Sequence, residues 1–384
     1  MTDVGPVTCA GCGLLCDDVT VEASSDRVRL RPECPLGTQW FSERLLAPAD
    51  APAATIDGEP ADLESALARA AEVLRGARRP LLHGFEGTTV EDARAAVTLA
   101  DRLGALVSTG DVAGAPAVAL RGASTATVGE IRDRSRLVVL WREDPDTTHP
   151  RLLERLGFGG DAPERTLVVV DDRETATARR AGAHLRWARD RDLEALTSLH
   201  MLQRGLALRP GDLETALRAL IELIDAVPHA TFVYGAGLTA GAGGQRRALA
   251  LHELVRALCR ERHAVTLELP SAPGTRSADE VLAWQSGYGG NVDFASGHPE
   301  LVTATRWFDD VDVTLRVEPG PTGSLLADGR GGREVWIRTA AAGVETGGTM
   351  HRLDGVPLTL QAPHPDDAPT VAAVMASLLA EIER

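Results

Sequence analysis

The sequence predicts an α/β protein whose parallel β-sheets are covered by helices on both faces. Two features of the chain lead to this prediction. Short apolar segments rich in Val and Leu, such as RLVVLW (136–141) and TLVVVD (166–171), are typical of strands buried on both faces. Longer segments between them, such as VEDARAAVTLADRLG (90–104), have apolar residues at helical spacing. Strands that alternate with helices form parallel sheets, and a chain of 384 residues has room for more than one.

The individual elements are predicted from local signals. The Pro- and Ala-rich stretch 46–61 follows a cysteine-rich segment and is predicted to be a linker. The next segment, DLESALARAAEVLRG (62–76), predicts a helix with Asp62 as its N-cap and Gly76 at its end. Strands are predicted at residues 80–85, 105–109, 136–141, 166–171, 231–236, 264–269, 312–317 and 334–339, and the helices between them include residues 90–104 and 245–262.

The charge of the chain restricts its partners. The net charge is -15, with 55 acidic and 40 basic residues, and all the basic residues are arginine. This acidic balance argues against nucleic acid or a membrane surface as a partner. Without lysine, the chain has no Schiff-base or lysine-base chemistry. Because it has neither a secretory signal nor an apolar run of membrane-spanning length, we expect a cytoplasmic protein.

Cysteines near the N-terminus predict a metal site. Cys9, Cys12 and Cys16 have the spacing C-x2-C-x3-C, and Cys34 follows after about the length of a hairpin. In the cytoplasm thiols stay reduced, so a tight cysteine cluster indicates a metal site rather than disulfides. Three cysteines in one loop and one remote cysteine favour an iron–sulfur cluster over zinc, which prefers two separate C-x2-C knuckles. Zinc and metal-free thiols stay open as alternatives. Cys259 is predicted to be buried on a helix face.

Other motifs have two interpretations each. The segment YGAGLTAGAGG (234–244) is either a phosphate loop before a helix or an ordinary connection between a strand and a helix. Asp171 and Asp172 end a predicted strand, where they either bind a ribose or lie in a solvated turn. No nucleophile elbow is present, so we assign no catalytic residue. Four histidines are too scattered in sequence to form a metal pair: His83, His149, His298 and His351.

Six segments of the chain, taken in order, carry a resemblance: VTCAGCGLLCDDV (7–19), RPLLHGF (79–85), RLVVLWREDPDTTHPR (136–151), RTLVVVDDRETATA (165–178), WQSGYGGNVDF (284–294) and GGTMHRLDGVP (347–357). In this order they resemble the B subunit of formylmethanofuran dehydrogenase, a molybdopterin oxidoreductase of the formate dehydrogenase group. The resemblance implies a formate dehydrogenase-like α/β fold with two Rossmann-like domains of parallel sheet. It implies a cysteine-rich lobe at residues 1–50, a split domain at 51–125 and 266–384, and an inserted domain at 126–265.

The resemblance also shows what this chain lacks. The family's active subunit carries a [4Fe-4S] cluster and a tungsten or molybdenum ion on two pterin dinucleotides. The four cluster ligands match Cys9, Cys12, Cys16 and Cys34, but Ala113 replaces the cysteine that binds the metal ion. Near the pterin, Arg142 and Glu143 replace small residues, where they should crowd the pocket, and Glu143 and Asp144 should repel a pyrophosphate. The segment 316–324 lacks the small polar loop expected for the second pterin. A substitute metal ligand such as the nearby Asp111 stays open.

The pattern is most similar to the B subunit of the bacterial formyltransferase/hydrolase complex, which acts in tetrahydromethanopterin-linked oxidation of formaldehyde to formate. We therefore expect a structural subunit without catalytic activity, with a possible [4Fe-4S] cluster or zinc and with no tungsten or molybdenum pterin. Its expected partners are the sister subunits and, as a further possibility, a methanofuran-type carrier. Two alternatives stay open. One is an active formylmethanofuran or formate dehydrogenase with an unusual metal ligand, and the other is a cluster- or zinc-bearing module that binds the carrier.

Overall fold

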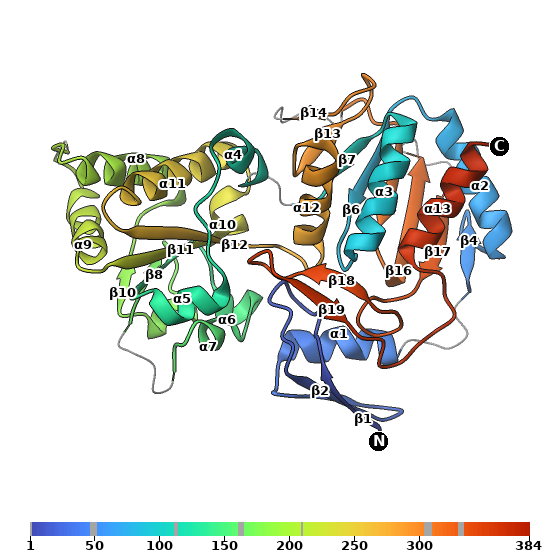
Figure 1. Cartoon of the computed structure of the whole chain (residues 1–384), viewed down its shortest axis with the longest axis horizontal. Coiled ribbons are helices and arrows are strands. Elements are labelled where there is room, and N and C mark those ends of the chain that lie inside the picture. Colours follow the sequence, from blue (N-terminus) through green and yellow to red (C-terminus); the bar gives the residue numbers. More distant parts are fainter. Residues whose placement is uncertain are drawn as a thin grey trace. The chain divides into compact units, whose positions relative to one another are not determined.

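The computed structural model describes residues 2–46, 52–110, 114–159, 165–208, 210–302, 309–328 and 334–384, with the backbone alone at 2–3 and 320–328. The chain divides into two compact units (Figure 1). The first unit comprises Met1–Val112 and Ala272–Arg384, and the second comprises Ala113–Ser271. None of the helices in the described part of the chain is both long and apolar enough to cross a membrane.

The second unit is built on a fully parallel five-stranded sheet of order β10-β9-β8-β11-β12. Its strands are β8 Leu137–Trp141, β9 Thr166–Val170, β10 Ala183–Leu185, β11 His229–Gly235 and β12 His263–Leu269. From β8 the chain moves outward through β9 to β10, and it then returns to β11 on the other side of β8. This reversal between β8 and β11 is the Rossmann-like arrangement, in which ligands bind where the strand order changes direction.

Helices surround this sheet because its strands are apolar on both faces. Every residue of β8 and of β11 is buried, so both faces need a cover. The longer helices are α8 Asp192–Gln203, α9 Glu214–Asp225 and α11 Gly244–Leu258, and the shorter ones are α4 Gly114–Arg121, α5 Val128–Arg134, α6 Pro145–Thr148, α7 Leu152–Arg155 and α10 Ala236–Thr239, with 3-10 turns at Ala178–Arg180 and Arg189–Arg191.

The first unit contains a mixed nine-stranded sheet of order β14-β13-β7-β6-β15-β16-β17-β4-β5. Only β7, β6 and β15 are parallel to one another, and the remaining pairings are antiparallel. The strands are β4 Ala54–Ile56, β5 Glu59–Ala61, β6 Pro80–Gly84, β7 Leu106–Ser108, β13 Asn291–Asp293, β14 Glu300–Leu301, β15 Val313–Val317, β16 Gly320–Asp328 and β17 Glu334–Thr339. Four helices pack side by side in this unit: α2 Leu63–Gly76, α3 Val90–Leu103, α12 Thr275–Ser286 and α13 Val371–Ile382 (Figure 1).

A small lobe precedes the large sheet of the first unit. It consists of the antiparallel strands β1 Thr2–Val7, β2 Val19–Ala23 and β3 Val28–Arg31, followed by α1 Pro35–Leu45. A separate hairpin, β18 Gly348–His351 with β19 Pro357–Leu360, contacts this lobe. Thr8 donates its hydroxyl to the carbonyl of Thr359 at 3.0 Å, and Leu353 donates its N–H to the carbonyl of Gly13 at 2.8 Å. The hairpin therefore ties the C-terminal part of the chain to the lobe.

The predicted α/β class and all eight predicted strands are confirmed, with ends that differ by at most two residues. Asp62 caps α2 by accepting the N–H of Ser65, and α2 ends at Gly76 as predicted. The prediction of parallel sheets is confirmed for the second unit. The sheet of the first unit is mixed, because β15 continues into the antiparallel strands β16 and β17.

Other sequence interpretations need correction. The stretch predicted as a linker contains the hairpin β4–β5 at the edge of the large sheet, while residues 47–51 lie outside the described part of the chain. The second unit also extends beyond the predicted 126–265. Its α4 packs on α11, and Thr125 pairs with Thr266 inside the unit. Cys259 is exposed at the end of α11 rather than buried on a helix face.

Candidate functional site

The cysteine loop connects β1 to β2 and carries three of the four predicted ligands. The N–H of Cys9 donates to the carbonyl of Cys16 at 2.8 Å and closes the loop at its base. Inside the loop, the N–H of Gly11 lies 3.4 Å from the Sγ atom of Cys9. The fourth cysteine, Cys34, is the N-cap residue of α1, and its side chain makes no capping hydrogen bond. Its sulfur is therefore not used to cap the helix.

Two glycines let the loop approach the first turn of α1. A Cβ atom on Gly37 would lie 3.1 Å from the Sγ atom of Cys9 and 3.7 Å from the Cβ atom of Cys34. A Cβ atom on Gly11 would lie 3.0 Å from the Cα atom of Gly37. Any larger residue at either glycine would push the loop away from the helix. The structure therefore brings Cys34 next to the loop cysteines, as the sequence predicts for a shared site.

Burial dominates the electrostatics of these thiols. It raises the pKa of Cys12 to about 12 and the pKa of Cys9 even further, and the neighbouring Cys16 and Cys34 add to both shifts. The first turn of α1 contains no acidic residue, so the partial positive charge of the helix N-terminus faces the cysteines without a competing carboxylate. A negatively charged metal–thiolate group suits such surroundings.

Four thiols are the donor set of either a [4Fe-4S] cluster or a zinc ion. Among the described residues, no group of three or more His, Cys, Asp or Glu side chains is arranged tightly enough to hold a metal ion. A zinc ion with Zn–S bonds of about 2.3 Å requires its four sulfurs to lie about 3.8 Å apart. In a [4Fe-4S] cluster each thiolate binds a different iron, so the ligands are spaced more widely. The set of four thiols has the donor chemistry for such a cluster.

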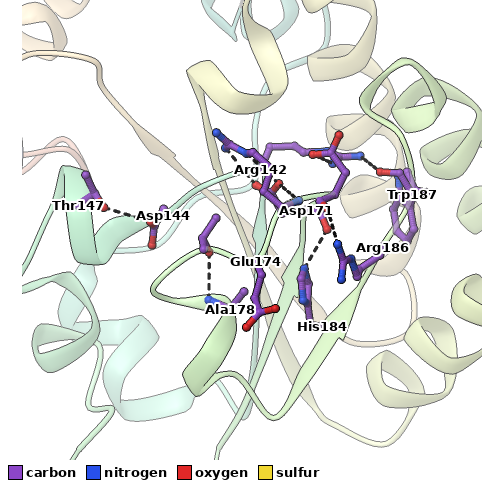
Figure 2. A network of polar contacts seen from close by, with 12 residues as sticks. Arg142, Asp144, Thr147, Asp171, Glu174, Ala178, His184, Arg186 and Trp187 are labelled. Carbon is purple, nitrogen blue, oxygen red and sulfur yellow. Dashed lines mark hydrogen bonds and ion pairs between the residues drawn. The ribbon is translucent and has the colours of Figure 1, made fainter.

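The second candidate site is the edge of the parallel sheet where β8 and β11 end. Arg142 follows β8 with a positive φ of 61°, and its side chain turns into the interior of the unit (Figure 2). Its Nη2 atom donates to Asp192 at 2.9 Å and to the carbonyl of Trp187 at 2.8 Å, and its Nη1 atom donates to Asp172 at 3.2 Å. Asp192 is fully buried. The prediction that Arg142 crowds an open pocket therefore needs correction, because its side chain is part of a buried ion pair.

Glu143 occupies the position between the two strand ends. Its Oε1 atom accepts the N–H of Gly237 at 2.8 Å. A Cβ atom on Gly235 would lie 3.0 Å from the same oxygen, and a Cβ atom on Gly237 would overlap the carbonyl oxygen of Arg142 at 1.8 Å. These two glycines are thus required by the close contact with the turn after β8. The carboxylate of Glu143 thus lies at the edge of the sheet where the strand order reverses, which is where Rossmann-like sheets bind their ligands.

The rest of the glycine-rich loop is held by arginines. Arg247 donates to the carbonyls of Leu238, Ala240 and Ala242, at 2.6, 2.8 and 2.9 Å. Arg189 donates to the carbonyl of Ala236 at 3.1 Å. A phosphate loop offers N–H groups to its ligand, whereas these contacts use the carbonyls. Together with Glu143, they favour a structural connection over a phosphate loop at residues 234–244.

The two aspartates after β9 are also occupied within the protein. Asp171 is buried and accepts the N–H of Arg173 at 2.8 Å, so it does not lie in a solvated turn. Burial raises the pKa of Asp171, but the hydrogen bonds from Arg173 outweigh this effect and lower it below the ordinary value. Asp172, which is half exposed, pairs with Arg142. Asp171 is thus not presented for binding a ribose, whereas Asp172 lies in an exposed turn, which agrees with the second interpretation for that residue.

Asp144 ties the turn after β8 to the turn after β9. It accepts the N–H of Thr177 at 3.0 Å. It also accepts the hydroxyl of Thr147 at 3.1 Å (Figure 2). Partial burial raises its pKa, but the hydrogen bonds lower it more, so the carboxylate stays ionised at neutral pH. All three polar residues after β8, from Arg142 to Asp144, thus have partners within the second unit.

The remaining predicted residues form no further site among the described parts of the chain. Ala113 and Asp111 lie outside the described residues. Burial lowers the pKa of His149 to about 4, and it also lowers the pKa of His83 and of His351. Asp192 and Trp187, the partners of Arg142, were not predicted from the sequence. The only sequence signal for them was the acidic start of the 192–203 helix, which is common and not specific.

The fold and the cysteine lobe define a class of protein, an α/β chain with a Rossmann-like unit and an N-terminal lobe bearing four cysteines. No protein-family model matches the chain. It is nevertheless a homologue of the B subunit of formylmethanofuran dehydrogenase, as the six sequence segments indicate. It is 28% identical to the B subunit of the tungsten-containing formylmethanofuran dehydrogenase 2 of Methanocaldococcus jannaschii, in an alignment of 408 positions that covers 92% of either chain. The protein of the same name from Methanococcus maripaludis is 25% identical, in an alignment of 406 positions that also covers 92% of either chain.

A solved structure shares the fold. It is a chain in the crystal structure of the formyltransferase/hydrolase complex from Methylorubrum extorquens, determined with methylofuran. The two chains superpose with a TM-score of 0.67 at 22% sequence identity, over 86% of this chain and 99% of the other. The match supports the mixed α/β architecture described above.

Proposed function

We propose that this chain is a structural, non-catalytic B subunit of a formyltransferase/hydrolase complex in tetrahydromethanopterin-linked one-carbon metabolism. The observation that carries the proposal is the Glu143 carboxylate on the N–H of Gly237, at the point where the sheet order reverses. A ligand bound at the carboxyl ends of the strands would need the position that Glu143 occupies. A pyrophosphate there would have to displace Glu143 and would also lie near the ionised Asp144.

The residues at this edge do not fit a tungsten or molybdenum pterin. The anion position is taken by a carboxylate, and the loop carbonyls of residues 236–242 are bound by Arg189 and Arg247. In the sequence, Ala113 replaces the cysteine that would bind the metal ion, and an alanine methyl group cannot do so. We therefore assign no redox step to this chain.

The cysteine lobe has a structural role in this proposal. Cys9, Cys12, Cys16 and Cys34 would hold a [4Fe-4S] cluster, with zinc as the alternative. When bound, such a group supplies four metal–sulfur bonds that cross-link the loop to α1. The protein provides the close contact between Gly11 and Gly37, the hydrogen bond that closes the loop, and the hairpin that holds the lobe.

The proposed partners are the sister subunits of the complex. Support comes from the homologues, which are named as subunits, and from the structural neighbour, which was solved as a complex. A methanofuran-type carrier would meet the assembly rather than this chain alone, since the neighbouring complex was determined with methylofuran. We place the complex in the cytoplasm, where the cysteines stay reduced.

Metal and pterin analysis tests the proposal. The chain and its complex are purified anaerobically from cells grown with and without tungstate and molybdate. We expect no tungsten, molybdenum or pterin in either preparation, and no dye-linked oxidation of formate. Pterin in stoichiometric amount with either metal, together with formate oxidation lost on metal starvation, would show an active dehydrogenase instead.

A second measurement tests the structural role. Deletion of the chain should impair assembly of the complex and lower its formyl-transfer activity. The variant D172N removes a half-exposed charge at the sheet edge and should leave that activity unchanged. Loss of activity in D172N with the complex still assembled would contradict the proposal, because the sheet edge would then take part in the reaction.

A further inference from the structure

One face of α1 continues from the cysteine site to a buried arginine. Gly37, which contacts Cys9, is followed by Trp40 and Arg44 at intervals of three and four residues, so the three residues lie on one face of the helix. Helical side chains lean toward the N-terminus, so the Arg44 side chain reaches back over Trp40 toward the cysteines. The Cζ atom of Arg44 lies 3.2 Å from the centre of the Trp40 ring.

Arg44 is buried without a buried counter-ion of its own. Its side chain is 9% exposed, and its Nη1 atom donates to the carbonyl of Trp40 at 3.0 Å. Among the described residues, its one carboxylate within 4 Å is the exposed Glu43, at 3.6 Å. Glu345 and Glu86 also lie near enough to favour the charge of Arg44, but among the described residues neither forms an ion pair with it within 4 Å, and Glu345 pairs with Arg338 at 3.0 Å. The buried Nε atom of Arg44 has no hydrogen-bond partner in the described part of the chain.

A buried cation that lacks a buried counter-ion is costly. The penalty for removing one charge from water is several kcal/mol in a folded protein, unless an opposite charge lies nearby. Four thiolates around either a zinc ion or a [4Fe-4S] cluster leave a net charge of about −2. Such a group, next to Cys9, is an anion of the right sign on the same face of α1.

We propose that Arg44 is the buried counter-ion of the metal–thiolate group held by Cys9, Cys12, Cys16 and Cys34. This inference rests on the metal site proposed above, and it makes Arg44 a positioning residue of that site. It does not depend on whether the metal is iron or zinc. A second arginine near the loop, Arg352, has its own partner, because Asp354 accepts from it twice, at 2.8 and 2.7 Å. In the described structure, Arg44 makes no such two-point pair.

The change in folding stability on replacing Arg44 tests this role, because it should have opposite signs with and without the metal. We compare wild type with R44Q in the full chain, with the metal bound and after its removal by a chelator. With metal bound, R44Q should be the less stable protein and should lose its metal to the chelator several-fold faster. Without metal, R44Q should be as stable as wild type or more stable, because an uncompensated buried charge is gone. The conservative variant R44K keeps the charge and should retain most of the metal affinity.

The reduction potential gives a second readout if the metal is iron. A nearby cation stabilises the more negative, reduced state of a cluster, so R44Q should have a lower midpoint potential in an EPR-monitored titration with dithionite. The matched control is R29Q, which removes an exposed arginine of the same lobe and should change neither potential nor metal loss.

Two results would overturn the inference, and they are distinguishable. If wild type holds its metal and R44Q matches it in metal loss and in stability in both states, Arg44 is not the counter-ion while the metal site stands. If wild type binds neither iron nor zinc after anaerobic purification and reconstitution, both the metal site and this role for Arg44 fail.

Discussion

At the residue scale, the Glu143 carboxylate accepts a backbone N–H at the sheet edge where other Rossmann-like sheets bind an anion. This carboxylate accepts the partly buried N–H of Gly237, and a Cβ atom on Gly235 would lie 3.0 Å from the same oxygen. Unlike a bound ligand, a carboxylate of the chain itself is always present to accept this N–H.

The variant E143A should destabilise the second unit by about 1–3 kcal/mol, because it leaves the N–H of Gly237 without its partner and opens a hole. The variant E143Q keeps an oxygen acceptor and should cost less. Urea denaturation followed by circular dichroism measures both. The control is E130A, which removes a solvent-exposed glutamate in the same unit. Equal stability of E143A and E130A would contradict a structural role for Glu143.

Arg142 and Asp192 form an ion pair whose single and double substitutions should not add. The variant D192A leaves the guanidinium of Arg142 buried with only the half-exposed Asp172, and should cost about 3–5 kcal/mol. In the double variant R142A/D192A no charge is stranded, so the total loss should be smaller than the sum of the two single losses. Chemical denaturation of the four proteins gives the coupling energy. A coupling energy near zero would mean that water or another group already compensates Arg142.

The sequence indicated which residue types lie at this site but not which residues they contact. The charged residues after β8 and the glycines after β11 are visible in the printed chain. That Glu143 reaches Gly237, and that Arg142 reaches Asp192, depends on the order of the strands and on the positive φ of Arg142. Contacts between residues about 50 or more positions apart follow from topology, which local spacing does not define.

At the scale of elements, the hairpin β18–β19 holds the cysteine lobe to the rest of the first unit. Besides the contacts of Thr8 and Leu353, the side chain of Gln361 accepts the N–H of Thr8 at 2.8 Å. Thr8 directly precedes Cys9, so these hydrogen bonds fix the start of the cysteine loop. The hairpin thereby links the C-terminal part of the chain to the metal site proposed above.

The variant Q361A should loosen the lobe without unfolding the large sheet. Hydrogen exchange of the backbone amides at residues 8–16 should become faster, while exchange in β6 and β15 stays unchanged. The control is Q39A, since Gln39 is an exposed residue of the same lobe that contacts only Glu43 in the described structure. Unchanged exchange at residues 8–16 in Q361A would show that the other hairpin contacts hold the lobe alone.

The strands that the sequence predicted well share one property, which is burial on both faces. Segments such as β8 and β9 are continuous apolar runs, and these are recognisable without any knowledge of neighbours. The missed strands are short or lie at sheet edges, such as β4, β5 and β14, and they have mixed composition. An edge strand is defined by the partner that it pairs with, so its own residues carry a weak signal.

At the scale of the whole molecule, each unit has its own hydrophobic core. The core of the first unit includes Leu82, Phe85 and Met375, and that of the second includes Trp141 and Phe232. The alternation of strands and helices predicted two such α/β units. Their boundaries were harder to predict, because α4 joins the second unit only through its packing on α11. Stability is therefore best followed for each unit separately.

The second unit should lose stability as the pH falls from about 6.5 to 4. Burial lowers the pKa of both His149 and His252 to about 4, and Tyr234 contacts the ring of His252 at 3.1 Å. Between these pKa values and the ordinary value near 6.5, the unfolded chain binds protons that the folded unit does not. Folding stability therefore rises with pH across this window and is lost on acidification.

Each pKa unit corresponds to about 1.4 kcal/mol, so the two histidines together account for a loss on the order of several kcal/mol. Urea denaturation at pH 7.5 and at pH 5, with a probe in the second unit, measures it. The double variant H149Q/H252Q has no such protons to bind and should show a much smaller difference between the two pH values. The control H298Q removes an exposed histidine of the first unit and should keep the wild-type difference. An equal loss in wild type and in H149Q/H252Q would place the acid sensitivity elsewhere in the unit. The remaining groups include His229, whose pKa burial also lowers, and the carboxylates of Asp144 and Asp171, whose lowered pKa values make the folded unit sensitive to acid.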